Sequence, residues 1–195
     1  MLKRILLPLL LAAVTLAGCR NSHQIENAAV IENVSVFTRS GRLYYTFYPL
    51  TDSEKPGSVA VPAESFEEAR SLAASRYIPN MTLAKLELLL IGTDVKKEVM
   101  RRDIKYISTQ ASISPVASVA LCDGNTLERL EKETSVQQTV HRLIDRLKRD
   151  DPEVKTDYLS VFNCYAKGGS KGFKVPLITC EGELKISERM SGSCS

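Results

Sequence analysis

Apolar and polar residues follow two kinds of pattern along the chain, one typical of strands and one typical of helices. Runs rich in β-branched, aromatic and leucine side chains predict strands at residues 28–37, 43–48, 59–61, 83–92, 116–122, 158–166 and 173–180. Apolar residues spaced three or four apart predict amphipathic helices at 65–77, from 94 onwards, at 126–133 and at 135–150. Because the two kinds of segment do not alternate strictly, we expect an α+β fold, a mixed sheet with packed helices.

The run LAKLELLLIG at residues 83–92 is densely apolar and ends at a glycine, which predicts a buried strand. We expect the apolar stretch from 83 to 122 to lie at the centre of the fold. Segment 43–48 follows a turn that contains Gly41 and forms a predicted hairpin with 28–37. Its side chains divide between two faces: Leu43, Tyr45 and Phe47 on one, and Tyr44, Thr46 and Tyr48 on the other. We expect cover on both faces, and an aromatic surface for a partner is the alternative.

Three helix starts carry residues that favour capping. Ser65 with Glu68 and Ser135 with Gln138 are typical of capping boxes, and Asp94 can cap the helix that follows it. The helix at 135–150 has one apolar face, and we expect its other face to be solvated. That polar face carries His141, Arg142, Arg146 and Arg149.

The first 18 residues follow a different pattern, with Lys3 and Arg4 before an apolar run at 5–16. A charged start, a short apolar middle and small residues at the end are typical of a secretory signal, and the run is too short to span about 30 Å of hydrocarbon comfortably. The end, Leu16-Ala17-Gly18-Cys19, resembles the lipobox of bacterial lipoproteins. The resemblance implies a diacylglyceryl thioether on Cys19 and cleavage before it. A plain secreted protein is the alternative.

This interpretation divides the chain into a lipoprotein signal peptide at 1–18, a lipidated tether at 19–24 and an α+β domain at 25–195. The domain can be subdivided into a main body at 25–152 and a terminal β annex at 153–195. The five residues after Cys19 reach at most about 17 Å when extended, so we expect the body to lie close to the membrane. Loss of Lys3 and Arg4 lowers the net charge from +3 to +1, because residues 1–18 contain no acid. A near-neutral domain lacks the basic surface that nucleic acid requires.

Candidate chemistry is sparse. We expect both histidines, His23 and His141, to be surface residues, and no HExxH or Walker pattern occurs. The segment AKGGSKGF at 166–173 lacks the phosphate-binding spacing and predicts a hairpin loop. The sequence therefore predicts no catalytic residue, no metal site and no cofactor, and a protein that is not an enzyme.

Four further cysteines remain after Cys19: Cys122, Cys164, Cys180 and Cys194. They are far apart and have no histidine at ligand spacing, which argues against zinc. Free buried thiols are the expectation, and export leaves a Cys164–Cys180 bridge as an open alternative.

Several segments, read in order, resemble the N-terminal half of the Ger(x)C family, the lipoprotein C subunits of bacterial spore germinant receptors. The matching segments are the lipobox, QIENAAVIENVSV, ESFEEARSLAASRYIPNMTLAKLELLLIGTDV, ISPVASVALCDG, VPLITCEGEL and SERMSG. Ala84-Lys85-Leu86 stands where the family usually has Ala/Ser-His-Leu, and Cys19-Arg20-Asn21 stands where Cys-Trp-Asp is common. Members of the family continue through a second half of similar size.

The resemblance implies a non-enzymatic subunit, lipid-anchored on the outer face of the spore inner membrane. Its partners would be membrane lipid through acylated Cys19 and the polytopic A-type and permease-like B-type receptor subunits. The family assigns no catalytic residue. Two alternatives remain open: a small-ligand-binding envelope lipoprotein associated with a transporter, and an envelope hydrolase that uses His141.

Overall fold

The computed structural model describes residues 28–50, 57–132, 134–166, 173–181 and 183–191. The signal, the tether and Cys19 therefore lie outside the described residues, as do His23 and Cys194. The strands of the described part are β1 (Ile31–Arg39), β2 (Arg42–Pro49), β3 (Val59–Pro62), β4 (Leu88–Gly92), β5 (Ser118–Cys122), β6 (Phe173–Glu181) and β7 (Glu183–Ser191). Its helices are α3 (Phe66–Arg76), α4 (Lys97–Thr109), α5 (Gly124–Lys132), α6 (Thr134–Asp150) and α7 (Tyr158–Ala166).

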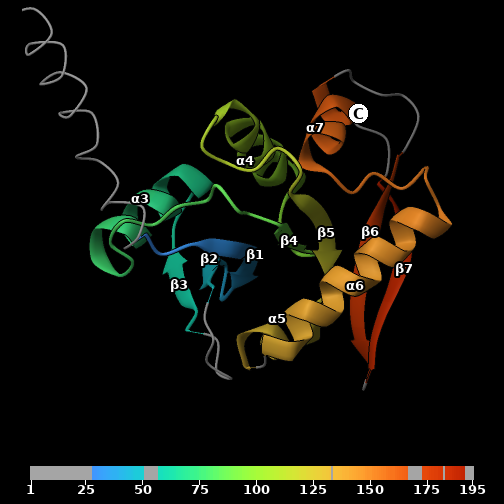
Figure 1. Cartoon of the computed structure of the whole chain (residues 1–195), viewed down its shortest axis with the longest axis horizontal. Helices are drawn as coiled ribbons and strands as arrows, with labels where there is room; N and C mark the ends of the chain where they lie inside the picture. Colours follow the sequence, from blue (N-terminus) through green and yellow to red (C-terminus); the bar gives the residue numbers. More distant parts are fainter. Residues whose placement is uncertain (1–27, 51–56, 133, 167–172, 182, 192–195) are drawn as a thin grey trace, which may run out of the picture.

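In the described part of the chain the strands form one seven-stranded mixed sheet in the order β3-β2-β1-β4-β5-β6-β7. The four strands β1, β4, β5 and β6 run parallel to one another, and β2, β3 and β7 pair antiparallel with their neighbours. Helices pack against both faces of this sheet (Figure 1). The α+β fold with a mixed sheet is confirmed.

Two apolar clusters fill the space between the sheet and its helices. One cluster contains Phe66 of α3, Ile104 of α4 and Val161 of α7, so these helices cover one face. The other contains Leu127 of α5 and Val140 of α6, which cover the opposite face. Burial of apolar surface on both faces is the main stabilising contribution to such a layered fold.

The centre of the sheet is the predicted apolar stretch. Leu88 and Leu90 of β4 belong to one cluster while Leu89 and Ile91 belong to the other, as the alternation of a strand requires. A strand covered on both faces needs apolar residues at every position, which explains the continuous run. β5 lies beside β4, so the central placement of residues 83–122 is confirmed.

Strand β2 is also covered on both faces. Tyr45 and Phe47 are buried in the cluster under α3 and α4, whereas Tyr48 is buried in the cluster under α5 and α6. The predicted cover on both faces is therefore confirmed, and the aromatic side chains do not form an exposed surface.

The helix caps agree with the sequence only in part. The Ser65 hydroxyl accepts a hydrogen bond from the Glu68 N–H (3.2 Å), so the predicted cap of α3 is confirmed. The prediction for Asp94 is wrong, since α4 begins at Lys97 and its preceding residue makes no capping side-chain bond. Ser135 is not a cap either, because α6 already begins at Thr134.

The segment 158–166 is helix α7, and its prediction as a strand is wrong. A short apolar run is compatible with either a strand or a buried helix. Here the Asp157 carboxylate accepts a hydrogen bond from the Ser160 N–H (2.8 Å), which caps a helix start. Tyr158 and Val161, three residues apart, then face the core. The loop 167–172 lies outside the described residues, but it follows a helix and so does not join two strands.

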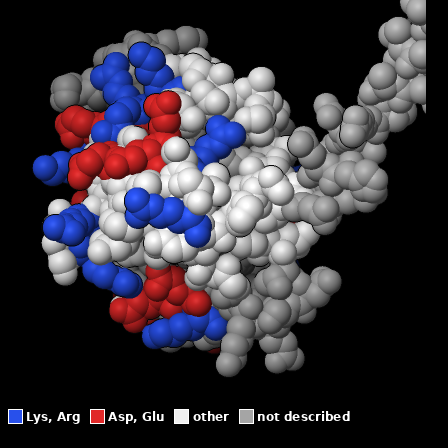
Figure 2. Space-filling model, turned by 90° about the vertical axis from the view of Figure 1, so that its left-hand side faces the viewer, with Lys and Arg blue, Asp and Glu red and all other residues white. Residues whose placement is uncertain are grey.

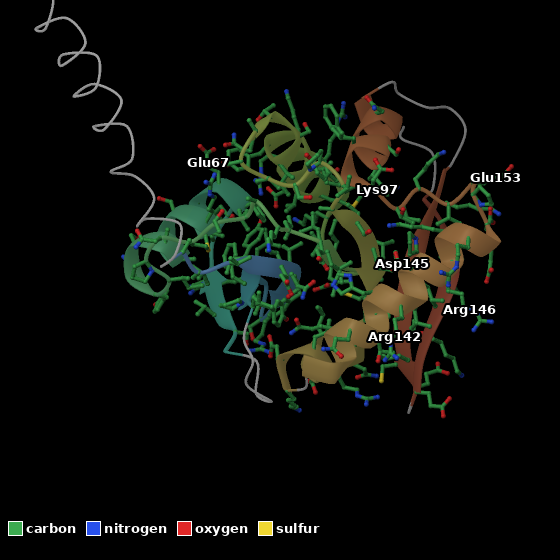
Figure 3. All side chains as sticks on the ribbon, viewed as in Figure 1. Glu67, Lys97, Arg142, Asp145, Arg146 and Glu153 are labelled. Atoms are coloured by element: carbon green, nitrogen blue, oxygen red, sulfur yellow. The ribbon has the colours of Figure 1, made fainter. Side chains whose placement is uncertain are left out.

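The polar face of α6 is mostly solvated. Arg142, Arg146 and Arg149 are exposed as predicted, and Figure 3 shows Arg142 and Arg146 projecting from α6. The prediction that His141 is a surface residue is wrong, because its side chain is only 26% exposed. It lies four residues after buried Gln137, so the helical repeat turns both toward β1.

Candidate functional site

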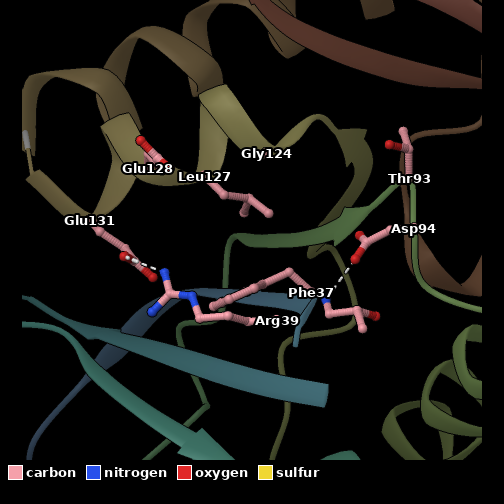
Figure 4. A pocket seen from close by; sticks show the side chains of 9 residues that line it. Phe37, Arg39, Thr93, Asp94, Gly124, Leu127, Glu128 and Glu131 are labelled. Carbon is pink, nitrogen blue, oxygen red and sulfur yellow. Dashed lines mark hydrogen bonds and ion pairs between the residues drawn. The ribbon is translucent and has the colours of Figure 1, made fainter. Parts of the chain in front are cut away.

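A pocket of about 320 Å³ opens at the edge where the parallel strands β1, β4 and β5 end, which we call the carboxyl edge (Figure 4). Three segments line it: the end of β1, the two residues after β4, and α5. The lining residues are Phe37, Thr38, Arg39, Thr93, Asp94, Gly124, Leu127, Glu128 and Glu131.

The topology explains why a crevice forms there. The chain leaves β4 toward α4 on one face of the sheet and leaves the adjacent β5 toward α5 on the other face. Connections that diverge in this way leave a space outside the carboxyl ends of the strands, where open α/β sheets commonly bind ligands. The pocket lies at this divergence.

Asp94 joins the ends of two strands. Its Oδ2 accepts a hydrogen bond from the Thr38 N–H at the end of β1 (2.9 Å). Its Oδ1 lies so close to Gly92 that a Cβ there would be 2.4 Å away. Glycine at 92 therefore lets the Asp94 carboxylate fold back over the end of β4, which is why this carboxylate does not cap α4.

Aromatic and charged side chains form the floor and one wall of the pocket. Phe37 stacks on Tyr44 with ring centroids 5.8 Å apart. The Arg39 guanidinium lies 5.3 Å from the centre of the Phe37 ring and 3.6 Å from the Glu131 carboxylate of α5. Leu127 projects from α5 toward Phe37 (Figure 4). An apolar floor thus meets a charged rim.

The charges of the lining favour positive ligands. Asp94, Glu128 and Glu131 contribute three carboxylates, against the single guanidinium of Arg39. The first turn of α5 is already capped, because Asp123 Oδ1 accepts hydrogen bonds from the N–H (2.8 Å) and hydroxyl (2.6 Å) of Thr126. The start of α5 therefore offers little to an anion.

Neither of the two cysteines whose side chains the structure describes, Cys122 and Cys180, lines this pocket. Cys122 and Cys180 are free and buried, so the alternative Cys164–Cys180 bridge is wrong. Burial, reinforced by the charges of Asp123 and Asp94, raises the pKa of the Cys122 thiol and keeps it protonated. The Cys180 sulfur accepts a hydrogen bond from Arg129 (3.2 Å).

His141 lies apart from the pocket. Its Nε2 is 2.8 Å from Asn33 Oδ1, while Asn33 Nδ2 donates to Gln137 Oε1 (2.7 Å). Because the Asn33 oxygen accepts, His141 carries its proton on Nε2. Burial lowers the pKa of His141, although Glu87, 3.8 Å away, opposes this shift. The structure does not bring His141 into the pocket that the hydrolase interpretation would require.

Sequence reasoning did not identify the pocket residues. The available signal was a polar residue directly after each of two buried strands: Thr93-Asp94 after β4 and Asp123-Gly124 after β5. Parallel strands bring such residues to one edge, but the direction of each strand had to be known first.

The fold and pocket together define a mixed-sheet α+β protein with a crevice at the carboxyl edge of its parallel strands. The chain matches no protein-family model, no curated protein and no solved structure. Among the described residues, no helix has the length and apolar character needed to cross a bilayer. Membership of the Ger(x)C family therefore stays a prediction from the sequence segments quoted above.

Proposed function

We propose that the chain is a non-enzymatic, lipid-anchored subunit like the C subunit of spore germinant receptors, acting in nutrient-triggered germination through contacts with the A-type and B-type subunits. The observation that carries this proposal is the ordered series of Ger(x)C-like segments that begins at the lipobox. Within the described chain these segments supply the strands β1, β4, β5, β6 and β7 of one sheet and the helix α3 that packs on it.

The position of the apolar exposed residues supports a membrane-proximal orientation. The described chain enters β1 at the edge where the parallel strands begin, which we call the amino edge. Four large apolar side chains are exposed among the described residues: Leu50, Tyr77, Val116 and Leu159. Each lies in or beside a segment at this edge, where backbone hydrogen bonds join the ends of β2, β1 and the link to β4.

The side of the molecule that carries α3 and β3 shows uncharged surface that is crossed and flanked by charged side chains (Figure 2). Its exposed residues include Glu67, Glu68 and Arg76 as well as Ala60 and Ser75. This side therefore lacks the depletion of charge that is typical of protein contacts. The amino edge is the surface that we assign to the membrane subunits.

The test compares Cys19→Ser with the natural chain, and uses Cys194→Ser as the matched control. The natural chain and the control should incorporate radioactive palmitate, remain with membranes and co-purify in detergent with the A-type and B-type subunits. Cys19→Ser should lose all three properties. Membrane retention of Cys19→Ser would contradict the anchor, whereas labelling without co-purification would contradict the receptor role alone.

The pocket favours a second candidate function, a small-ligand-binding envelope lipoprotein associated with a transporter. A volume of about 320 Å³ is at the small end of the range of ligand sites. A ligand at about 100 times its Kd adds about 2.7 kcal/mol of stability, which a thermal-shift screen detects. A screen without any stabilising compound would contradict this second function.

A further inference from the structure

We propose that the pocket between β1, β4 and α5 binds a small organic cation, an ammonium or guanidinium group that carries a short apolar chain. The proposal deepens the second candidate function by naming its ligand class. It does not depend on the anchor or on the receptor subunits.

The floor of the pocket fits the apolar part of such a ligand. Phe37 and Leu127 are 6% and 5% exposed, and both belong to the cluster between the sheet and α5. Their positions are fixed by packing from below, and their remaining surface faces the cavity. A short alkyl chain resting on them would leave water, which favours binding by the hydrophobic effect.

The rim fits the charged part. The lining carries the three carboxylates of Asp94, Glu128 and Glu131 against the guanidinium of Arg39. Lys132, outside the lining, lies 3.8 Å from Glu128, so the rim keeps an excess of one negative charge. The Asp94 carboxylate accepts a hydrogen bond from the Thr38 N–H, and the Glu131 side chain is only 25% exposed. Charges of one sign in a crevice raise the local concentration of ligands of the opposite sign.

Arg39 shows how a cation fits here. Its guanidinium lies at once over an aromatic ring, 5.3 Å from the Phe37 centroid, and beside a carboxylate, 3.6 Å from Glu131. A cation over an aromatic face is an established mode of organic-cation recognition, and the neighbouring carboxylate adds an attractive charge. Because the Arg39 side chain is 58% exposed, it can swing into solvent and yield this position to a ligand. Arg39 is then a competitor of the ligand.

This role predicts opposite effects for the two members of the ion pair. Arg39→Gln removes the competitor and should tighten binding of a cation about two- to fivefold, while Glu131→Gln should weaken it by a similar factor. The matched controls Arg149→Gln and Glu153→Gln change the same charges at exposed positions outside the pocket. They should leave affinity within the error of the measurement.

The experiment uses the full chain in a non-ionic detergent and titrates it with butylammonium, 1-butanol and butyrate by calorimetry at low and high salt. Butylammonium should bind tightest, and added salt should weaken it. Equal binding of butylammonium and butanol would overturn the proposal, as would tighter binding of butyrate or weaker cation binding by Arg39→Gln. None of these results affects palmitate labelling or co-purification, so failure here is distinct from failure of the proposed germination role.

Discussion

At the scale of single residues, Asp103 shows how a charged group is accommodated in the core. It is 4% exposed, and its carboxylate accepts hydrogen bonds from the Tyr45 hydroxyl (2.5 Å), Arg102 Nε (3.1 Å) and the Phe66 N–H (3.3 Å). Arg102 also donates to the Glu64 carbonyl oxygen. One carboxylate thereby joins α4 to β2 and to the start of α3.

Burial raises the pKa of Asp103 above its ordinary value of 3.8, and its hydrogen bonds only partly oppose this. An acid with a raised pKa in the folded state contributes stability at low pH, and this contribution is lost as the pH rises through the folded pKa. Asp103→Asn cannot accept all three bonds and should lower the free energy of unfolding by about 1–3 kcal/mol.

The difference between the natural chain and Asp103→Asn should also grow as the pH falls from about 7 to about 4.5. Urea unfolding at the two pH values measures it, and all other titrating groups cancel in the comparison. A difference that shrinks with acidification would show that the Asp103 pKa is lowered and not raised.

Position 92 requires glycine, because Asp94 and Phe37 leave no room for a side chain there. A Cβ at this position would lie 2.4 Å from Asp94 Oδ1 and 3.3 Å from Phe37 Cα, so Gly92→Ala displaces the Asp94 carboxylate. Loss of its bond to Thr38 and the crowding against β1 should cost about 1–3 kcal/mol in urea unfolding. Gly57→Ala is the control, because a Cβ there meets nothing within 4 Å.

In an Asp94→Ala background the same Gly92→Ala change should cost less, since one of the two clashes is gone. Equal costs in both backgrounds would mean that the crowding against Phe37, and not Asp94, explains the need for glycine.

At the scale of secondary-structure elements, α6 lies on β1 through a polar contact in which His141 meets Asn33. Burial lowers the pKa of His141 below 6.5, so between this value and its folded pKa only the unfolded chain takes up a proton. The natural chain should therefore lose stability relative to His141→Gln as the pH falls from about 7.5 to about 5.5.

Gln at 141 can still donate a hydrogen bond to Asn33. The difference in pH dependence between the two chains therefore reports the titration of His141. Urea midpoints of both chains at the two pH values test it, with Arg142→Gln as an exposed control on the same helix. Parallel pH profiles for the natural chain and His141→Gln would contradict the shift.

The same elements show which parts of the fold the sequence could predict. Alternating and dense apolar runs predicted β1, β2, β4, β5 and β6. Burial of a strand on one or both faces requires such a pattern of apolar residues in the local sequence. α7 was missed, because its apolar run is as compatible with a strand as with a buried helix, and the cap at Asp157 is a weak local signal. Asp94 resembled a cap, but its contact with Thr38 joins residues 56 positions apart.

The burial of His141 was missed for a related reason. A helical repeat gives the angle of a side chain around α6, but not how far the covered face extends. The width of that face is set by Asn33, which is 108 positions away in the sequence. The pocket was likewise not predictable, since it needs the parallel register of β1, β4 and β5.

At the scale of the whole molecule, the parallel strands give the body two unlike edges. The amino edge carries the exposed apolar residues and receives the described chain, whereas the carboxyl edge carries the acidic pocket. If Cys19 is anchored as proposed, the amino edge faces the bilayer and its subunits, and the pocket opens toward the aqueous side. Contact with the membrane subunits and access of a small cation would then not compete.

A substitution at Val116 tests this orientation, because Val116 is 75% exposed at the amino edge. Val116→Glu should change the free energy of unfolding by less than about 0.5 kcal/mol, as is usual at exposed positions. It should nevertheless reduce detergent co-purification with the A-type and B-type subunits severalfold, because a carboxylate there must be desolvated on contact. Gln138→Glu adds the same charge at an exposed position of α6 and should leave co-purification unchanged. Loss of the complex by Gln138→Glu alone would move the contact surface to α6, so that the amino edge would not be the side facing the membrane.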